Sequence, residues 1–210
     1  MTEAARRQMV ADQLRRRGLC DERVLAAMAL VPRELFVTTE EQSHSYEDTP
    51  LPIGEGQTIS QPYMVAKMAE LCALSGDERV LEIGGGSGYA AAILSRLARQ
   101  VITIELRSAL AERATRSLEK AGLSNVTVVV GDGTLGWPAG APYEAIVVSA
   151  GAPAIPAPLV AQLADGGRLI VPVGDRQGQD LLVVRRAEGR ISVERELGCR
   201  FVELRGEYGW

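Results

Sequence analysis

The stretch Val80-Leu-Glu-Ile-Gly-Gly-Gly-Ser-Gly-Tyr89 joins a short apolar run to a helical pattern through a glycine-rich loop. Gly84, Gly86 and Gly88 occupy alternate positions, where glycine lets the backbone adopt positive φ and approach a ligand closely. The dinucleotide fingerprint G-x-G-x-x-G would need glycine where Tyr89 stands, and shifting its start to either following glycine also fails. The stretch therefore predicts a strand, a ligand-binding loop and a helix, without indicating a dinucleotide.

Apolar runs and helical patterns alternate around this loop. Strands are predicted at Val80–Ile83, Val101–Ile104, Val126–Val130, Ala145–Val148 and Arg168–Val173, and helices at Tyr63–Ala73, Tyr89–Leu97, Ser108–Ala121 and Leu159–Ala164. Uniformly apolar strands separated by helices indicate a parallel sheet covered on both faces. Leu181–Arg186 and Ile191–Leu197, on either side of Glu188-Gly189, predict an antiparallel pair. The expected fold is α/β, a doubly wound, mostly parallel sheet of seven strands of Rossmann-like type.

The segment before this core has a different character. Glu3–Arg17 is charged and favours a helix, and Asp21 is placed to cap a second helix that ends at Leu30. Prolines and glycines are too frequent in Ser43–Pro62 for regular structure, so we expect an ordered loop packed on the body. The predicted division is 1–62 for the helical extension and loop, and 63–210 for the core, within one structural unit.

Composition excludes several classes of protein. The chain has 210 residues and a formal net charge of −4, which argues against a domain that mainly holds nucleic acid. The chain has no run of about 18 apolar residues, and its N-terminus is charged, so we expect a cytoplasmic protein without a membrane partner. His44 is the only histidine, and three cysteines lack C-x-x-C spacing, so no metal centre is expected. A monomer is expected.

Acidic side chains follow three successive predicted strands. Glu82 lies at the end of the first strand, Glu105 follows the second and Asp132 follows the third. Because ligands bind at the carboxyl ends of parallel strands, these carboxylates should surround one ligand. Glu82 disfavours a pyrophosphate and favours a ligand with ammonium and sulfonium groups, such as S-adenosylmethionine. Glu105 suits hydrogen bonds with ribose hydroxyls, although the nearby Arg107 means that a ribose with a 2′-phosphate is not excluded. Asp132 suits an adenine amino group, but Asp between two glycines is also typical of a plain turn after a strand.

The residues after the fourth predicted core strand narrow the acceptor. Enzymes that methylate amino groups of nucleic acids carry Asp/Asn-Pro-Pro-aromatic there, whereas this chain has Val148-Ser-Ala-Gly151. No cysteine is placed to act as the nucleophile of a C5-pyrimidine enzyme, and no cluster of metal-binding carboxylates suits a catechol enzyme. The remaining possibility is a methyl acceptor that is nucleophilic without activation by the enzyme.

Six stretches resemble the protein-L-isoaspartate (D-aspartate) O-methyltransferase family and together span nearly the whole chain. They are Val31-Pro-Arg-Glu-Leu-Phe-Val37, Leu51-Pro-Ile-Gly-Glu-Gly-Gln-Thr-Ile-Ser-Gln-Pro-Tyr-Met64, Val80 to Tyr89, Gly131-Asp-Gly133, Ala141-Pro-Tyr-Glu-Ala-Ile-Val-Val148 and Arg200-Phe-Val202. The second is the specific one, because many methyltransferases share the glycine motif. The resemblance implies methyl transfer from S-adenosylmethionine to the α-carboxylate of L-isoaspartyl residues in damaged proteins. It also implies that the ester then leads through a succinimide to aspartate.

The resemblance also assigns roles to residues. It implies that Ser60 is the active-site residue, and that Thr58, Ile59 and Val202 bind the substrate. The residues that it implies for the cofactor are Glu82, Gly84, Gly86, Ser87, Gly88, Glu105, Asp132 and Gly133. The chain departs from the family at Gly85, often threonine, at Gly151, usually alanine, and at Glu203, commonly proline. We expect the first two to change only packing and Glu203 to alter the substrate wall.

Methylation of a peptide carboxylate does not require a histidine base, which agrees with a chain whose only histidine is His44. A peptide carboxylate has a pKa of roughly 3.5 to 4 and is already the nucleophile at neutral pH. Alignment of an anion with a cationic methyl donor in a poorly hydrated site is then the main task, and Ser60 would orient the carboxylate. Two alternatives remain: a carboxyl methyltransferase acting on aspartate of a dedicated peptide, and a non-catalytic S-adenosylmethionine-binding or RNA-associated module.

Overall fold

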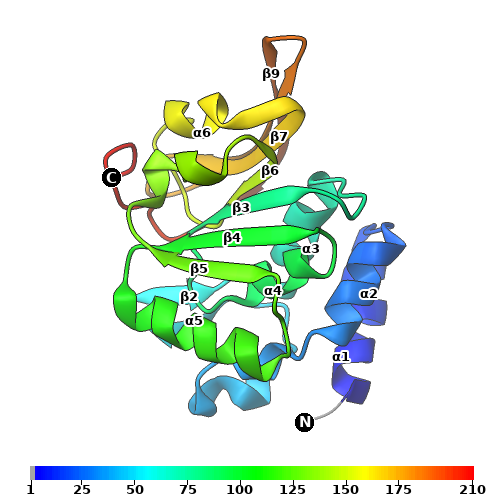
Figure 1. Cartoon of the computed structure of the whole chain (residues 1–210). Coiled ribbons are helices and arrows are strands. Elements are labelled where there is room, and N and C mark those ends of the chain that lie inside the picture. The colour runs from blue at the N-terminus through cyan, green and yellow to red at the C-terminus, as the bar shows by residue number, and fades with distance from the viewer. Residues whose placement is uncertain (1–2) are drawn as a thin grey trace.

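A seven-stranded sheet forms the centre of the computed structural model, which describes residues 3–210 (Figure 1). The strands are β3 (Arg79–Ile83), β4 (Gln100–Glu105), β5 (Val126–Val130), β6 (Tyr143–Val148), β7 (Leu163–Gly174), β8 (Gln179–Ala187) and β9 (Arg190–Cys199). Their spatial order is β5-β4-β3-β6-β7-β8-β9, parallel from β5 to β7 and antiparallel for β8 and β9. The predicted sheet is confirmed, and its chain order reverses at β3, where a ligand crevice is expected.

Helices cover both faces of the sheet, as the apolar strands require. They are α1 (Glu3–Met9), α2 (Glu22–Leu30), α3 (Pro62–Leu71), α4 (Tyr89–Ser95), α5 (Ser108–Lys120) and α6 (Ala157–Ala161). Successive residues of β3 point to opposite faces: Val80 belongs to the larger core cluster, with α2, α3, α4 and α5, and Leu81 to the smaller one, with α6. None of these helices has the length and apolar character that crossing a membrane requires.

The N-terminal segment forms two helical arms, as predicted, but the first is not a continuous α-helix. After α1, Val10–Leu14 widens into a π-helix and Arg15–Arg17 tightens into a 3-10 turn that ends at Gly18, with a φ of 88°. Val10 and Leu14 are both buried, so tertiary packing sets the local geometry there. The Asp21 carboxylate caps α2 by accepting hydrogen bonds from two backbone N–H groups of its first turn, as predicted.

A β-hairpin occupies the segment in which no regular structure was expected. Strands β1 (Leu51–Gly54) and β2 (Gln57–Ile59) pair antiparallel, so the prediction of a loop throughout Ser43–Pro62 was wrong. The glycines shape the turn, because Gly54, the last residue of β1, and Gly56, between the strands, adopt φ of 85° and 68°. Proline is tolerated because both strands belong to a two-stranded sheet with free edges.

The helix predicted at Leu159–Ala164 is displaced. In the structure, α6 ends at Ala161, three residues before the expected end of the helix, and Leu163 already belongs to β7. Leu163 pairs with Tyr143 of β6 and is almost fully buried, so a place in the sheet prevails over its helix preference.

Candidate active site

The carboxyl ends of β3, β4 and β5 bring the three predicted acidic residues to one edge of the sheet. Glu82 precedes the last residue of β3, Glu105 ends β4, and Asp132 follows β5, and these strands are direct neighbours. The backbone N–H groups of Gly84 and Gly85 donate to the carbonyl of Ile104, at 2.9 and 3.1 Å, which fixes the start of the glycine loop. The expected gathering at one edge is confirmed.

Glu82 is a fully buried carboxyl beneath this loop. Its two oxygens accept hydrogen bonds from the hydroxyls of Thr103, at 2.6 Å, and Ser149, at 3.2 Å. Burial raises the pKa of Glu82 to about 7, although these two hydrogen bonds oppose the rise and Glu105 adds to it. A cationic group bound nearby would favour the ionised form, so the carboxyl fits the ammonium group of an amino-acid ligand.

Glu105 holds the loop together. One carboxylate oxygen accepts from the N–H of Gly86, at 2.8 Å, and the other from the N–H of Arg107, at 2.9 Å. Each oxygen keeps a second lone pair, so the carboxylate can still accept from ribose hydroxyls. The predicted cofactor role of Glu105 thus fits its position.

Asp132 has partners within the protein that the sequence did not show. One oxygen accepts from the N–H and hydroxyl of Thr134, and the other accepts from the N–H of Glu207 in the C-terminal tail, at 2.8 Å. Although its partial burial acts in the opposite direction, these hydrogen bonds hold the pKa of Asp132 below its ordinary value. Asp132 therefore fixes both a turn and the tail, and its contact with adenine stays a prediction.

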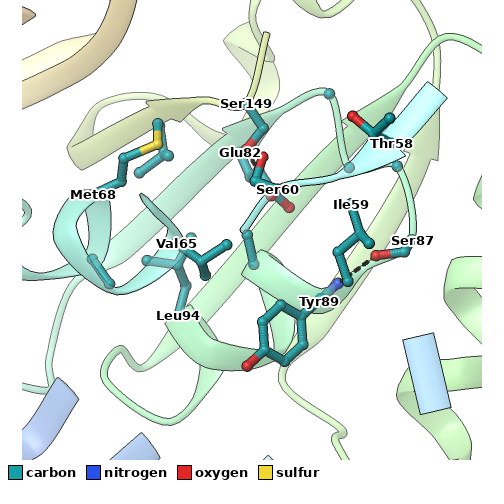
Figure 2. A pocket seen from close by; sticks show the side chains of 16 residues that line it. Thr58, Ile59, Ser60, Val65, Met68, Glu82, Ser87, Tyr89, Leu94 and Ser149 are labelled. Carbon is teal, nitrogen blue, oxygen red and sulfur yellow. Dashed lines mark hydrogen bonds between the residues drawn. The ribbon is translucent and has the colours of Figure 1, made fainter. Parts of the chain in front are cut away.

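An inner pocket joins the glycine loop to the hairpin. Figure 2 shows Ser60, Glu82 and Ser149 near one another in this pocket, with Thr58 and Ser87 farther along it. Its lining also includes Ile59, Gly84, Gly85 and Gly86. Four of the eight residues expected to hold the cofactor therefore meet in one pocket with Ser60, Thr58 and Ile59; the other four, Gly88, Glu105, Asp132 and Gly133, are not part of its lining.

The Ser60 hydroxyl is available for a ligand. The residue that precedes α3 as its cap is Gln61, and no side-chain hydrogen bond caps this helix. Within residues 3–210, the Ser60 hydroxyl makes no hydrogen bond, and the residue is partly exposed in the pocket. Ser60 therefore does not cap α3.

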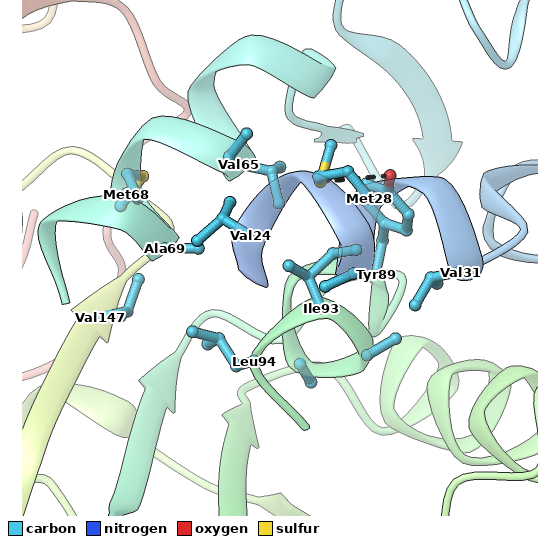
Figure 3. Packing of buried hydrophobic residues seen from close by; sticks show 14 of the residues in the cluster. Val24, Met28, Val31, Val65, Met68, Ala69, Tyr89, Ile93, Leu94 and Val147 are labelled. Atoms are coloured by element: carbon cyan, nitrogen blue, oxygen red, sulfur yellow. Dashed lines mark hydrogen bonds between the residues drawn. The ribbon is translucent and has the colours of Figure 1, made fainter. Parts of the chain in front are cut away.

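Apolar side chains close the other side of the inner pocket. Val65 and Met68 of α3, Tyr89 and Leu94 of α4, and Val147 of β6 line it and also belong to the larger core cluster (Figure 3). Helical periodicity alone does not distinguish such residues from those that lie only in the core. This wall keeps water from part of the pocket, which favours the joining of opposite charges.

An outer cleft of about 600 Å³ continues from the inner pocket, with which it shares Thr58, Ser60 and Ser149. Val202, predicted to contact the substrate, lines this cleft, and its carbonyl accepts from the N–H of Gly151 at 2.8 Å. Arg17, Arg176 and Arg200 also line this cleft. The sequence did not indicate that these three arginines meet, because they are distant in the chain and only Arg200 lies in one of the motifs.

The model of the protein-L-isoaspartate(D-aspartate) O-methyltransferase family matches residues 5–209. The chain belongs to this family. A relative named protein-L-isoaspartate O-methyltransferase from Methanoregula boonei is 56% identical over 205 residues, which cover 98% of this chain and 94% of the relative. Another with the same name, from Roseiflexus castenholzii, is 57% identical over 204 residues, which cover 97% and 94%.

Solved structures agree with this membership. A protein-L-isoaspartate O-methyltransferase superposes with a TM-score of 0.88 at 33% identity and covers 97% of this chain and 67% of its own. A Plasmodium falciparum protein described as a β-aspartate methyltransferase, solved with S-adenosyl-L-homocysteine, gives 0.82 at 25% identity and covers 95% and 98%. The fold predicted from the strand pattern is thus that of the protein-L-isoaspartate O-methyltransferases.

Gly85, at which the chain departs from the expected family pattern, is enclosed. A Cβ atom at this position would lie 2.4 Å from the hydroxyl oxygen of Thr103, which is itself fully buried and donates to Glu82. The absence of a side chain at Gly85 thus leaves room for the hydrogen bond that holds the buried carboxyl. The departure at Gly85 therefore concerns packing against Thr103, next to the buried carboxyl of Glu82.

We expect Gly85→Ala to lower the free energy of unfolding by roughly 1 to 3 kcal/mol, because the new methyl group overpacks the site. In a Thr103→Ala background the same change should be much less harmful, since the clashing hydroxyl is gone. Urea denaturation of the two single variants and the double variant measures this coupling. Gly178→Ala is the control, because a Cβ there meets nothing within 4 Å. Equal stability of the Gly85→Ala and Gly178→Ala variants would contradict the argument.

Proposed function

We propose that this member of the family transfers the methyl group of S-adenosylmethionine to the α-carboxylate of L-isoaspartyl residues in damaged proteins. The observation that carries the proposal is the continuity of two cavities at Ser60. The inner pocket contains the glycine loop and a buried acid, and the outer cleft is open to a peptide. Family membership, over residues 5–209, supports the same reaction. The methyl ester then leads through a succinimide to aspartate.

The inner pocket fits the donor. S-adenosylmethionine supplies an electrophilic methyl group on a sulfonium cation. The ionised Glu82 would bind its ammonium group, the loop Gly84–Ser87 would lie against its methionine part, and Glu105 would accept from its ribose. Asp132 and Gly133 would lie near its adenine, where Asp132 is already held by the turn and the tail.

Ser60 would align the acceptor. Its unbonded hydroxyl can donate to one oxygen of the isoaspartyl α-carboxylate, so that the other oxygen faces the methyl group. The carboxylate is ionised at neutral pH and needs no base, which agrees with a site that contains no histidine. Thr58 and Ile59, beside Ser60, and Val202, in the lining of the outer cleft, would contact the peptide.

The test is a comparison of two isomeric peptides. With radiolabelled S-adenosylmethionine, an L-isoaspartyl peptide should gain base-labile methyl groups, and the same peptide with normal aspartate should gain almost none. Preferential labelling of the aspartyl isomer would instead indicate a methyltransferase for a dedicated peptide. Binding of S-adenosylmethionine without any transfer would indicate the non-catalytic module.

We also propose that the enzyme acts in the cytoplasm, as a monomer, on proteins and peptides and not on nucleic acid. The three free cysteines support a reducing compartment, and the net charge of −4 supports a partner other than nucleic acid. Sedimentation of the purified protein at micromolar concentration tests the monomer, since a dimer would double the mass.

A further inference from the structure

The outer cleft has a positive wall, although the chain as a whole carries a net charge of −4. Three arginines line it: Arg17 before α2, Arg176 between β7 and β8, and Arg200 directly after β9. Glu203 is the only acidic residue among the lining residues. A charge pattern that opposes the overall charge at a substrate cleft points to a property of the substrate.

Two of these guanidinium groups are already engaged. Arg17 pairs with Asp48 and stacks over the ring of Tyr63, at 3.5 Å from its centroid. Arg176 donates to Glu203 at 2.8 Å, and Arg205, outside the cleft, reaches the other oxygen of the same carboxylate. The guanidinium groups of the three lining arginines and of Arg205 are thus balanced only by the carboxylates of Asp48 and Glu203, which leaves two positive charges without a paired carboxylate.

Arg200 carries the unbalanced charge that a substrate can reach. The residue is exposed, and among the described residues it has no ion pair and no hydrogen bond. Its backbone position is nevertheless fixed, because the next N–H group, that of Phe201, donates to Gln179 at 2.8 Å. A charged side chain on a fixed backbone, free of partners and lining the cleft, is suited to pair with a group on the substrate.

We propose that Arg200 is a specificity-determining residue, and that it favours isoaspartyl sites with an acidic side chain within two residues of the isoaspartyl position. The inference rests on the proposed function. The α-carboxylate itself is aligned at Ser60, in the inner part of the cleft, so a second anion on the peptide is the partner left for Arg200. Glu203 limits the contribution of Arg176 by pairing with it.

The experiment uses one L-isoaspartyl peptide in which each of the two preceding and two following positions is in turn glutamate, glutamine or lysine. For the wild type, kcat/KM with glutamate should exceed that with glutamine by about two- to fivefold at one or more positions, as expected for an exposed ion pair. The preference should shrink in 1 M salt, since screening weakens such pairs.

Four variants locate the effect. Arg200→Gln should bring the glutamate-to-glutamine ratio close to one, and Arg200→Glu should reverse the preference toward lysine. Glu203→Gln should increase the ratio, because it releases Arg176 and Arg205. Arg190→Gln is the matched control: it removes an exposed arginine at the opposite end of β9 and should leave the ratio unchanged. The affinity for S-adenosylmethionine, measured for each variant, checks that the fold is retained.

The outcomes separate this inference from the proposed function. If the wild type methylates all the isoaspartyl peptides equally well, or if Arg200→Gln keeps the wild-type ratio, the inference is overturned and the proposed function stands. If no isoaspartyl peptide is methylated, the proposed function fails and the inference with it.

Discussion

Replacing Glu82 with glutamine is expected to weaken the binding of S-adenosylmethionine by about 10- to 100-fold, the effect of losing a hydrogen bond to a charged group. The amide can keep the hydrogen bonds with Thr103 and Ser149, because a hydroxyl both donates and accepts. The loss therefore reports the missing negative charge. Calorimetric titration of the two proteins measures it, with Glu112→Gln, an exposed change of the same kind on α5, as the control.

The same variant should be more stable than the wild type without ligand. Burial raises the pKa of Glu82 from 4.5 to about 7, so between these pH values the folded protein holds this proton more tightly than the unfolded chain. Stability from this group is present below pH 4.5 and is lost as the pH rises to 7, a loss of about 3 kcal/mol. Glutamine does not titrate, so its advantage in urea denaturation should appear at pH 8 and vanish at pH 4.5.

The pH dependence of binding follows from the same carboxyl. A cationic ligand binds the ionised form, so the affinity of the wild type for S-adenosylmethionine should rise as the pH increases through 7 and level off above it. Affinity that does not change between pH 5.5 and 8, or a Glu82→Gln variant that binds as tightly as the wild type, would contradict the assigned role.

Replacing Ser60 with alanine is expected to lower kcat by more than tenfold and to leave the affinity for S-adenosylmethionine nearly unchanged. The hydroxyl makes no hydrogen bond within the described residues, so its removal leaves no partner unsatisfied and should not destabilise the fold. The expected loss corresponds to about 1.4 kcal/mol or more of transition-state stabilisation. Steady-state kinetics with an isoaspartyl peptide, together with calorimetry, separates the two effects.

Ser60→Thr provides the conservative comparison, because it keeps a hydroxyl at the same position. It should recover part of the activity lost in the alanine variant. If Ser60→Ala turns over at the wild-type rate, Ser60 has no part in the reaction, and a loss of cofactor affinity equal to the loss of kcat would place it at the cofactor instead.

The sheet could be predicted from the sequence because it rests on local patterns. Buried parallel strands are uniformly apolar, as in Ala145–Val148, and the final antiparallel pair is marked by the turn at Glu188-Gly189. The hairpin β1–β2 was missed because its prolines and glycines, read locally, disfavour strands. Its apolar side chains, such as Ile53, gain burial only from the rest of the fold.

The candidate site divides in the same way. The strand-end acids were predictable because the topology of a parallel sheet places them at one edge, but their environments were not. Glu82 is completely buried and accepts hydrogen bonds from Thr103 and Ser149, which no sequence spacing connects to it. Asp132 accepts a hydrogen bond from the C-terminal tail, 75 residues later in the chain. The arginines of the outer cleft belong to three separate segments and meet only in the folded protein.

The central claim is that the acidic edge of the sheet accepts a positively charged methyl donor. Calorimetric titration of the wild-type protein at pH 8 with S-adenosylmethionine, and separately with NADH and ATP, tests it most directly. The account predicts saturable binding of S-adenosylmethionine at one site per chain and no heat beyond dilution with the two phosphate-bearing nucleotides. Saturable binding of NADH or ATP, with none of S-adenosylmethionine, would contradict it.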